Sequence, residues 1–177
     1  MATEAARLEN KEPTGRKKKN QLDLTLTGLL MEGAKPYAVK IICESEVTIV
    51  TVQETLAVAE QLLPGRPAPD GTEDARWQAI IQVAMFAERE PEVIWPFVLK
   101  WGSHEEEDVR AAIATCLLED LLQYHFDLLF PLVASAAKSN EFFAKTTAMC
   151  WKFGEAAEPT RAAQFDALCA EIRKSRT

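Results

Sequence analysis

A cluster of one histidine and four carboxylates is the first place to look for chemistry in this chain. His104 is followed directly by Glu105, Glu106, Glu107 and Asp108. A metal site needs ligands that converge on one point at about 2 Å, whereas consecutive residues at a helix start point in different directions. The cluster therefore indicates an acidic helix start and predicts no metal ligand.

The second histidine, His125, lies between Tyr124 and Phe126. A histidine can act as a general base, but nucleophilic catalysis also needs a paired serine or cysteine, and no such pattern accompanies His125. We interpret it as a turn histidine packed by aromatic rings. The sequence therefore predicts no catalytic residue and no cofactor-binding residue.

The four cysteines, Cys43, Cys116, Cys150 and Cys169, are far apart and form no Cys-x-x-Cys pair. Isolated cysteines are usually small buried hydrophobes, and their unpaired use is typical of a reducing compartment. The N-terminal residues are polar, and no apolar run reaches the roughly 18 residues of a membrane span. We therefore expect a cytoplasmic protein without a membrane partner.

Four tryptophans in 177 residues suggest a binding surface as an alternative to core packing. Trp101 and Trp151 each stand beside a lysine, and exposed tryptophan next to charge is typical of interfaces and cation–π contacts. Core packing and partner binding both stay open for these two residues. The candidate residues for contact with a partner protein are Trp101, Arg110, Trp151 and Lys152.

Several of these residues belong to a stretch, residues 107–140, that predicts a helix–turn–helix unit. Asp108 is a suitable N-cap for its first helix, which carries apolar residues at spacings of three and four. A turn over residues 123–126 follows, and Asp127 can cap the second helix. Pro131 then falls at about the fourth helical position, where a proline forfeits no hydrogen bond. The apolar stripe of the first helix comprises Val109, Ile113, Cys116, Leu117, Leu121 and Tyr124.

The unit recurs along the chain with a period near 34 residues. Asp74-Ala-Arg76 precedes Asp108-Val-Arg110 by 34 positions. One helix pair per period of this length is typical of an alpha-solenoid. The predicted repeat units cover residues 73–103, 107–139 and 140–174.

Three aromatic residues follow the same period in the second helix of each unit. Trp95, Phe130 and Phe165 are separated by 35 residues each. We therefore predict that they occupy equivalent buried positions. On that basis the deletion of Phe130 should cost about 3–5 kcal/mol, the usual range for a core aromatic.

The run Asp108-Val-Arg110-Ala-Ala112, followed by a helix, a short turn and a second helix, resembles a HEAT repeat. In that family the Asp and Arg commonly form a polar ladder between neighbouring units. The resemblance implies that Arg110 pairs with a carboxylate, and Asp74, Asp108 and Glu141 are within reach. The third unit keeps the helix but lacks the Asp and Arg. The resemblance implies an all-α fold, a right-handed alpha-alpha superhelix of about three helix pairs, that serves as a scaffold without activity.

The first part of the chain departs from this pattern. Residues 1–21 are polar and include the basic run 16–19, which we interpret as a disordered basic tail. We interpret residues 22–63 as an irregular N-terminal helical cap. Its predicted helices cover residues 22–33, 36–42 and 47–63. Residues 46–51 are β-branched and locally favour a strand, but no partner strand is evident.

The charge of the chain bears on its partners. Residues 1–20 hold six of the 20 basic and three of the 27 acidic side chains, so the rest carries a net charge of −10. An acidic body repels phosphate backbones and suits basic or neutral partners. We therefore predict a non-enzymatic scaffold for protein–protein interaction that binds an unidentified protein and not nucleic acid.

Two alternatives to the scaffold stay open. One is an acidic immunity or antitoxin-type inhibitor of a basic partner, because the body is acidic and lacks a catalytic pattern. The other is a DNA alkylation-repair glycosylase, because HEAT-like folds include such enzymes. Its DNA-facing surface would comprise Trp101, Arg110, Lys145, Trp151 and Lys152.

Overall fold

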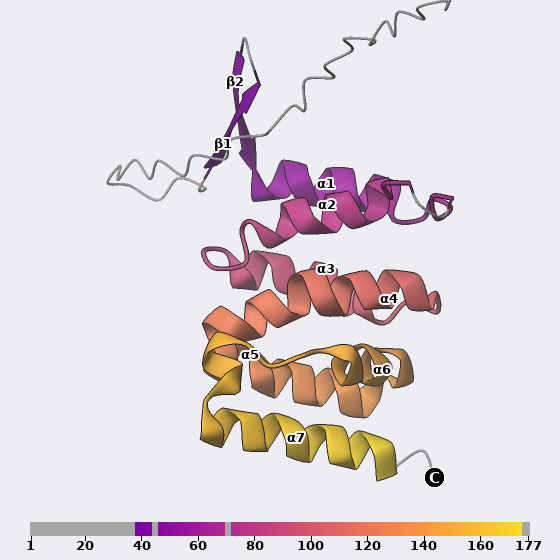
Figure 1. Ribbon diagram of the computed structural model, residues 1–177, viewed down its shortest axis with the longest axis vertical. Coiled ribbons are helices and arrows are strands. Elements are labelled where there is room, and N and C mark those ends of the chain that lie inside the picture. The colour runs from indigo at the N-terminus through magenta and orange to yellow at the C-terminus, as the bar shows by residue number, and fades with distance from the viewer. Residues whose placement is uncertain (1–37, 44–45, 70–71, 175–177) are drawn as a thin grey trace, which may run out of the picture.

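A computed structural model describes residues 38–43, 46–69 and 72–174 of the chain (Figure 1). The predicted basic tail, residues 1–21, and the predicted helix over residues 22–33 lie outside the described residues. Among the helices that are described, none is long and apolar enough to cross a membrane.

The body of the protein is a stack of helices along the long axis of the molecule (Figure 1). Residues 72–174 contain helices and turns and no strand, so the predicted all-α fold is confirmed for this part. The α-helices are α1 (Val52–Leu62), α2 (Ala75–Ala84), α3 (Pro91–Gly102), α4 (Glu107–Ile113), α5 (Glu119–Ser139), α6 (Glu141–Met149) and α7 (Pro159–Lys174). A π-helical segment, Ala114–Leu118, joins α4 to α5, and a 3₁₀-helix, Gly154–Ala157, precedes α7.

These helices form two layers. In one layer α4 contacts both α2 and α6, and in the other α5 contacts both α3 and α7. α5 is bent at His125, whose backbone angles (φ −140°, ψ 45°) are not helical. The part before the bend continues α4, and the part after it belongs to the layer of α3 and α7. α1 packs against the start of this stack, where it contacts α2 and α3.

The N-terminal cap is not wholly helical. β1 (Ala38–Cys43) and β2 (Glu46–Thr51) form an antiparallel hairpin, in which Ala38 pairs with Thr51. The helices predicted over residues 36–42 and from residue 47 are therefore wrong, because the β-branched run finds a partner strand just before it in the sequence. Thr51 ends β2 and caps α1, since its hydroxyl accepts the N–H of Glu54 and the Glu54 carboxylate accepts the N–H of Thr51.

Two predicted N-caps are also corrected. Asp108 lies inside the first turn of α4, and its carboxylate binds Arg76 at 2.5 Å in place of backbone N–H groups. Asp127 pairs with Arg161, and the N–H of Phe126 after the bend is accepted by Glu155 Oε2 at 3.0 Å. Each carboxylate meets an arginine from a distant helix, and a charged partner binds it more strongly than a local N–H.

Pro131 does not fall in the first turn of a helix. It lies six residues beyond the bend at His125, inside the second part of α5. At this position a proline removes one intrahelical hydrogen bond, the one its N–H would have donated to the carbonyl four residues earlier.

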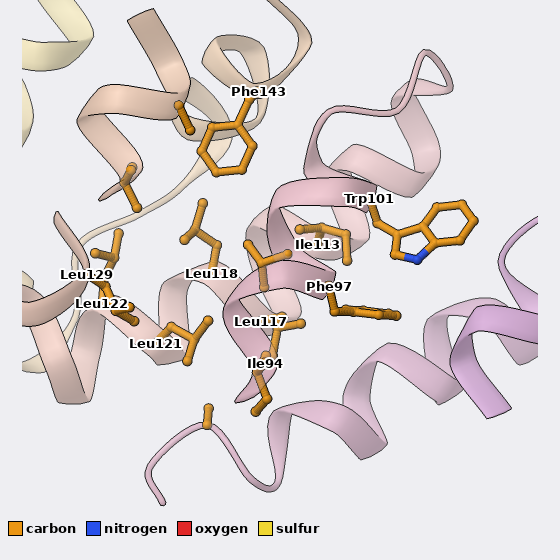
Figure 2. Packing of buried hydrophobic residues seen from close by; sticks show 14 of the residues in the cluster. Ile94, Phe97, Trp101, Ile113, Leu117, Leu118, Leu121, Leu122, Leu129 and Phe143 are labelled. Carbon is orange, nitrogen blue, oxygen red and sulfur yellow. The ribbon is translucent and has the colours of Figure 1, made fainter. Parts of the chain in front are cut away.

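The core runs continuously between the two layers (Figure 2). Phe165 is buried as predicted, but Trp95 and Phe130 are only half-buried at the edge of the core. The buried positions beside them are Ile94 and Leu129. The prediction of three equivalent buried aromatics is therefore wrong for two of them. In each of these two helices the residue just before the aromatic one faces the core in its place. The largest fully buried side chains are Phe126 and Phe143.

Candidate functional site

Trp101, a predicted contact residue, is part of the core. Its side chain is 4% exposed and lies beside Phe97, facing α1 (Figure 2). The indole Nε1 donates to Glu60 Oε1 at 3.1 Å, and Lys100 lies over the ring at 4.7 Å. The sequence gives no local signal for this burial, because Glu60 is 41 residues away. Trp101 is therefore not placed to contact a partner.

Arg110 is also buried, with 4% of its surface exposed. Its Nη1 donates to the carbonyls of His104 and Glu105 at 2.8 and 2.6 Å, and its guanidinium lies 5.2 Å from the centre of the Phe142 ring. Among the described residues no carboxylate pairs with it. The predicted ion pair of Arg110 is wrong, because the Phe142 ring and two backbone carbonyls lie beside its guanidinium in place of a carboxylate.

The arginine that is surrounded by carboxylates is instead Arg76, for which the sequence predicted only membership of the repeated Asp-x-Arg motif. Its side chain is 2% exposed and pairs with Asp74, Glu106 and Asp108 at 2.9, 2.8 and 2.5 Å. The Arg76 guanidinium lowers the pKa of Asp74 from 3.8 to about 2. A shallow pocket borders this cluster, but its carboxylates are already used by Arg76. The cluster is thus a structural link between α2 and α4.

Trp151 is the most exposed large apolar side chain among the described residues, at 73%. It lies on a segment that runs from the end of α6 back across the stack towards the bend in α5 (Figure 1). The Trp151 N–H donates to Glu119 Oε1 at 2.8 Å, and the Cys150 thiol lies 3.6 Å from the carbonyl oxygens of Ala114 and Thr146. The backbone under the exposed indole is therefore fixed to the helix beside it.

The far end of the same segment is fixed as well. Gly154 has a φ of +47°, and a Cβ atom there would lie 2.8 Å from the carbonyl oxygen of Gln123. Glu155 accepts the N–H of Phe126 and faces Arg161. Phe153, between these anchors, is 47% exposed. The segment thus presents two apolar rings on a backbone that is held at both ends.

Lys152, the fourth predicted contact residue, is half-buried and its Nζ pairs with Asp166 of α7. The positive charge of Lys152 is therefore already paired with a carboxylate of the same chain. Of the four predicted contact residues only Trp151 projects freely. The glycosylase surface also loses support, because two of its five residues, Trp101 and Arg110, are buried.

Glu119, which the sequence did not identify as a functional residue, holds the backbone of the segment that carries Trp151. It is 7% exposed, and burial raises its pKa above the ordinary value of 4.5, while the hydrogen bond from the Trp151 N–H lowers it in part. Burial also raises the pKa of the neighbouring Asp120. The sequence gives no local signal for this burial, because Glu119 falls off the apolar stripe of the predicted helix and its partner, Trp151, is 32 residues away.

The pH dependence of stability should report the role of Glu119. A raised pKa in the folded state means that folding binds a proton, so the contribution of Glu119 to stability is present below its ordinary pKa of 4.5 and falls as the pH rises above it. Glu119→Gln keeps an oxygen that can accept the Trp151 N–H and removes the charge. We therefore expect a flatter pH profile of urea unfolding and equal or higher stability at neutral pH.

Glu119→Ala is the matched control for that experiment. It removes both the charge and the acceptor, and leaving the Trp151 N–H without a partner should cost about 1–3 kcal/mol. Equal stability of the Gln and Ala variants at neutral pH would contradict a supporting role for this hydrogen bond.

The histidines and cysteines have structural surroundings. His104 Nδ1 accepts the N–H of Glu106, and His125 Nε2 lies 2.8 Å from the carbonyl oxygen of Glu88. Burial raises the pKa of the Cys150 thiol well above 9.0, so it stays protonated and unreactive. No group of three or more metal-binding side chains occurs within the described part of the chain.

Comparisons of this chain with protein-family models, with curated proteins and with solved structures found no match.

Proposed function

We propose that this chain is a non-enzymatic helical scaffold that binds another protein, in the cytoplasm, through the face that carries Trp151. The observation that carries the proposal is an indole 73% exposed on a backbone anchored by Glu119. Exposed tryptophans are frequent centres of binding energy in protein interfaces. A side chain presented on an ordered segment also loses less conformational entropy on binding than one on a free loop.

The resemblance to HEAT repeats supports a scaffold. Arg76 and Asp108 of successive helix pairs form the polar contact that the resemblance implies between units. We propose that the three helix pairs are HEAT-like repeats wound as a right-handed superhelix. Stacked pairs of this kind offer an extended surface whose contacts are spread over several units.

Trp151→Ala should reduce partner recovery without loss of fold. The test is an affinity pull-down from the native host with mass spectrometry, in which we expect the wild-type chain to recover a specific protein. Val58→Ala is the matched control, because Val58 is 53% exposed on α1 at the other end of the stack. Circular dichroism checks that both variants fold.

Equal recovery by the wild-type chain and the Trp151→Ala variant would remove the assignment of this face. Recovery of no protein, together with turnover of a small molecule or nucleic acid by the purified chain, would overturn the scaffold proposal itself.

A second candidate function is an acidic inhibitor that covers a basic partner. It is favoured by the net charge of −10 beyond residue 20. The two functions differ in their dependence on salt, because steering between oppositely charged surfaces is screened at high ionic strength. Association that weakens steeply with salt supports the inhibitor, whereas salt-insensitive association that needs Trp151 supports the apolar scaffold face.

A further inference from the structure

Arg76 and Arg110 occupy equivalent places in successive helix pairs, 34 residues apart, but their surroundings differ. Arg76 is surrounded by carboxylates, including those of Glu106 and Asp108. The Arg76 Nε also donates to Asp74 at 3.2 Å. Its positive charge is therefore fully matched inside the protein.

Of the three positions that would supply partners to Arg110, Asp108 pairs with Arg76 instead, and the other two hold uncharged residues. Asn140 stands 34 residues after Glu106, and Phe142 stands 34 residues after Asp108. The Asn140 side-chain oxygen accepts the N–H of Phe143, so it caps α6 and does not face Arg110 as a partner. The Arg110 Nε is buried without a hydrogen-bond acceptor.

Among the described residues, neither an acceptor for this Nε–H nor a carboxylate that balances the charge of the buried guanidinium is present. Two carbonyl oxygens and the face of the Phe142 ring are its partners. Carbonyl dipoles and a ring face compensate a desolvated charge less well than a carboxylate does. A buried N–H without an acceptor also retains its full desolvation cost. A carboxylate at this place would remove both deficits.

The same ring carries a second cation at the surface. Lys145 Nζ lies 5.1 Å from the centre of the Phe142 ring, and Phe142 is 37% exposed. Lys145 is half-buried and pairs with Glu141 at 2.7 Å on the solvent side of α6. One half-exposed ring thus lies between a buried arginine and a lysine near the surface.

We propose that Arg110, Phe142 and Lys145 form a binding site for a carboxylate, supplied by an aspartate or glutamate side chain of the partner protein. The bound carboxylate accepts a hydrogen bond from the Arg110 Nε–H and pairs with Lys145, and the Phe142 ring moves aside to admit it. The identity of the partner as a protein rests on the proposed function, whereas the site itself rests on Arg110.

Two observations favour a carboxylate over a phosphate. The equivalent arginine, Arg76, is bound by carboxylates in the same fold. The net charge of −10 on the surrounding body repels polyanions such as nucleic acid, while a single acidic side chain meets only the local cations.

The site and Trp151 can be reached by one partner segment. Trp151 follows Phe142 by nine residues: the first seven steps, to Met149, span about 10 Å along α6, and two further residues beyond the helix lead to Trp151. An extended peptide covers this length in about four residues, at roughly 3.3 Å each. The partner should therefore carry an acidic residue about four positions from a bulky apolar one.

The experiment uses the full chain and an acetylated, amidated pentapeptide, Gly-Ser-Glu-Ser-Gly, with its Gln counterpart as control. The arginine Nε–H resonances are followed by NMR at constant ionic strength. We expect the Glu peptide to shift the Arg110 resonance with saturation, the Gln peptide to leave it unchanged, and the Arg76 resonance to stay in place with both. Inorganic phosphate is titrated in parallel.

A pair of variants tests whether Arg110 lacks a carboxylate. Phe142→Asp supplies one within the chain, at the position equivalent to Asp108, so it should occupy Arg110 and abolish the response to the Glu peptide. Val58→Asp adds the same charge at an exposed position of α1, outside the site, so it should leave the response intact. Lys145→Gln, at the rim of the site, should weaken the response.

The proposal is overturned by equal responses to the Glu and Gln peptides, by equal responses of the Phe142→Asp and Val58→Asp variants, or by no response in the wild-type chain. Tighter binding of phosphate than of the Glu peptide would overturn the assignment to carboxylate. A saturating response to the peptide combined with a pull-down that recovers no protein would uphold the site and reject the proposed function.

Discussion

Replacing Arg76 by methionine should lower the free energy of unfolding by about 3–5 kcal/mol, the usual range for removing one partner of a buried ion pair. The side chain is 2% exposed and binds three carboxylates, from Asp74, Glu106 and Asp108. Methionine fills a similar volume but leaves those carboxylates close together without a cation. Their repulsion and desolvation then act against the packing of α2 on α4.

Arg110→Met is the matched control, since Arg110 is equally buried at the equivalent position. Among the described residues no carboxylate loses a partner in this variant, so we expect a smaller loss of about 1–3 kcal/mol, the scale of the two carbonyl hydrogen bonds that are lost. Urea unfolding with equal slopes measures both variants. Equal losses in the two variants would contradict the assignment of Arg76 as the charged link.

The free energy of unfolding at low pH provides a check on the same prediction. The folded-state pKa of Asp74 is lowered to about 2 from 3.8, so its contribution to stability is present above its ordinary pKa and is lost as the pH falls towards 2. The difference between the wild-type chain and the Arg76→Met variant should therefore shrink over this range.

Replacing Phe143 by alanine should cost about 3–5 kcal/mol, the range for deleting a core aromatic. Phe143 is fully buried, and Trp95 packs against it edge to face at 5.9 Å. The fit is close at Gly102, where an added Cβ would lie 2.9 Å from the Phe143 ring. The surrounding helices cannot close such a cavity without moving α3 towards α6.

Phe130→Ala is the control for this second prediction, because Phe130 is half-buried. It keeps part of its surface in water and stacks on Phe126 at 4.6 Å, so its deletion should cost only about 2 kcal/mol. Chemical denaturation of both variants decides the order. A larger loss for Phe130 would mean that the edge of the core, and not its centre, holds the two layers together.

The sequence by itself determined the helical class of the body and the approximate places of its helices. The apolar stripe from Val109 to Leu121 and the breakers before α2 and α3 are local signals, which act through residues three or four positions apart. The same local reasoning located the turn near His125, although the chain there is a bend within one long helix. It also selected Trp151, the one candidate contact residue that projects freely.

The tertiary structure decided which partners these residues have. The residues before α1 form a strand because they pair with β1. Glu60 accepts the indole N–H of Trp101, and the ring of Phe142 lies beside Arg110 where a carboxylate was predicted. None of these contacts follows from local periodicity, because burial and ion pairing depend on residues that are distant in sequence. Carboxylates balance the charge of Arg76, whereas none among the described residues balances that of Arg110. This difference arises only where helices that are distant in sequence pack against one another.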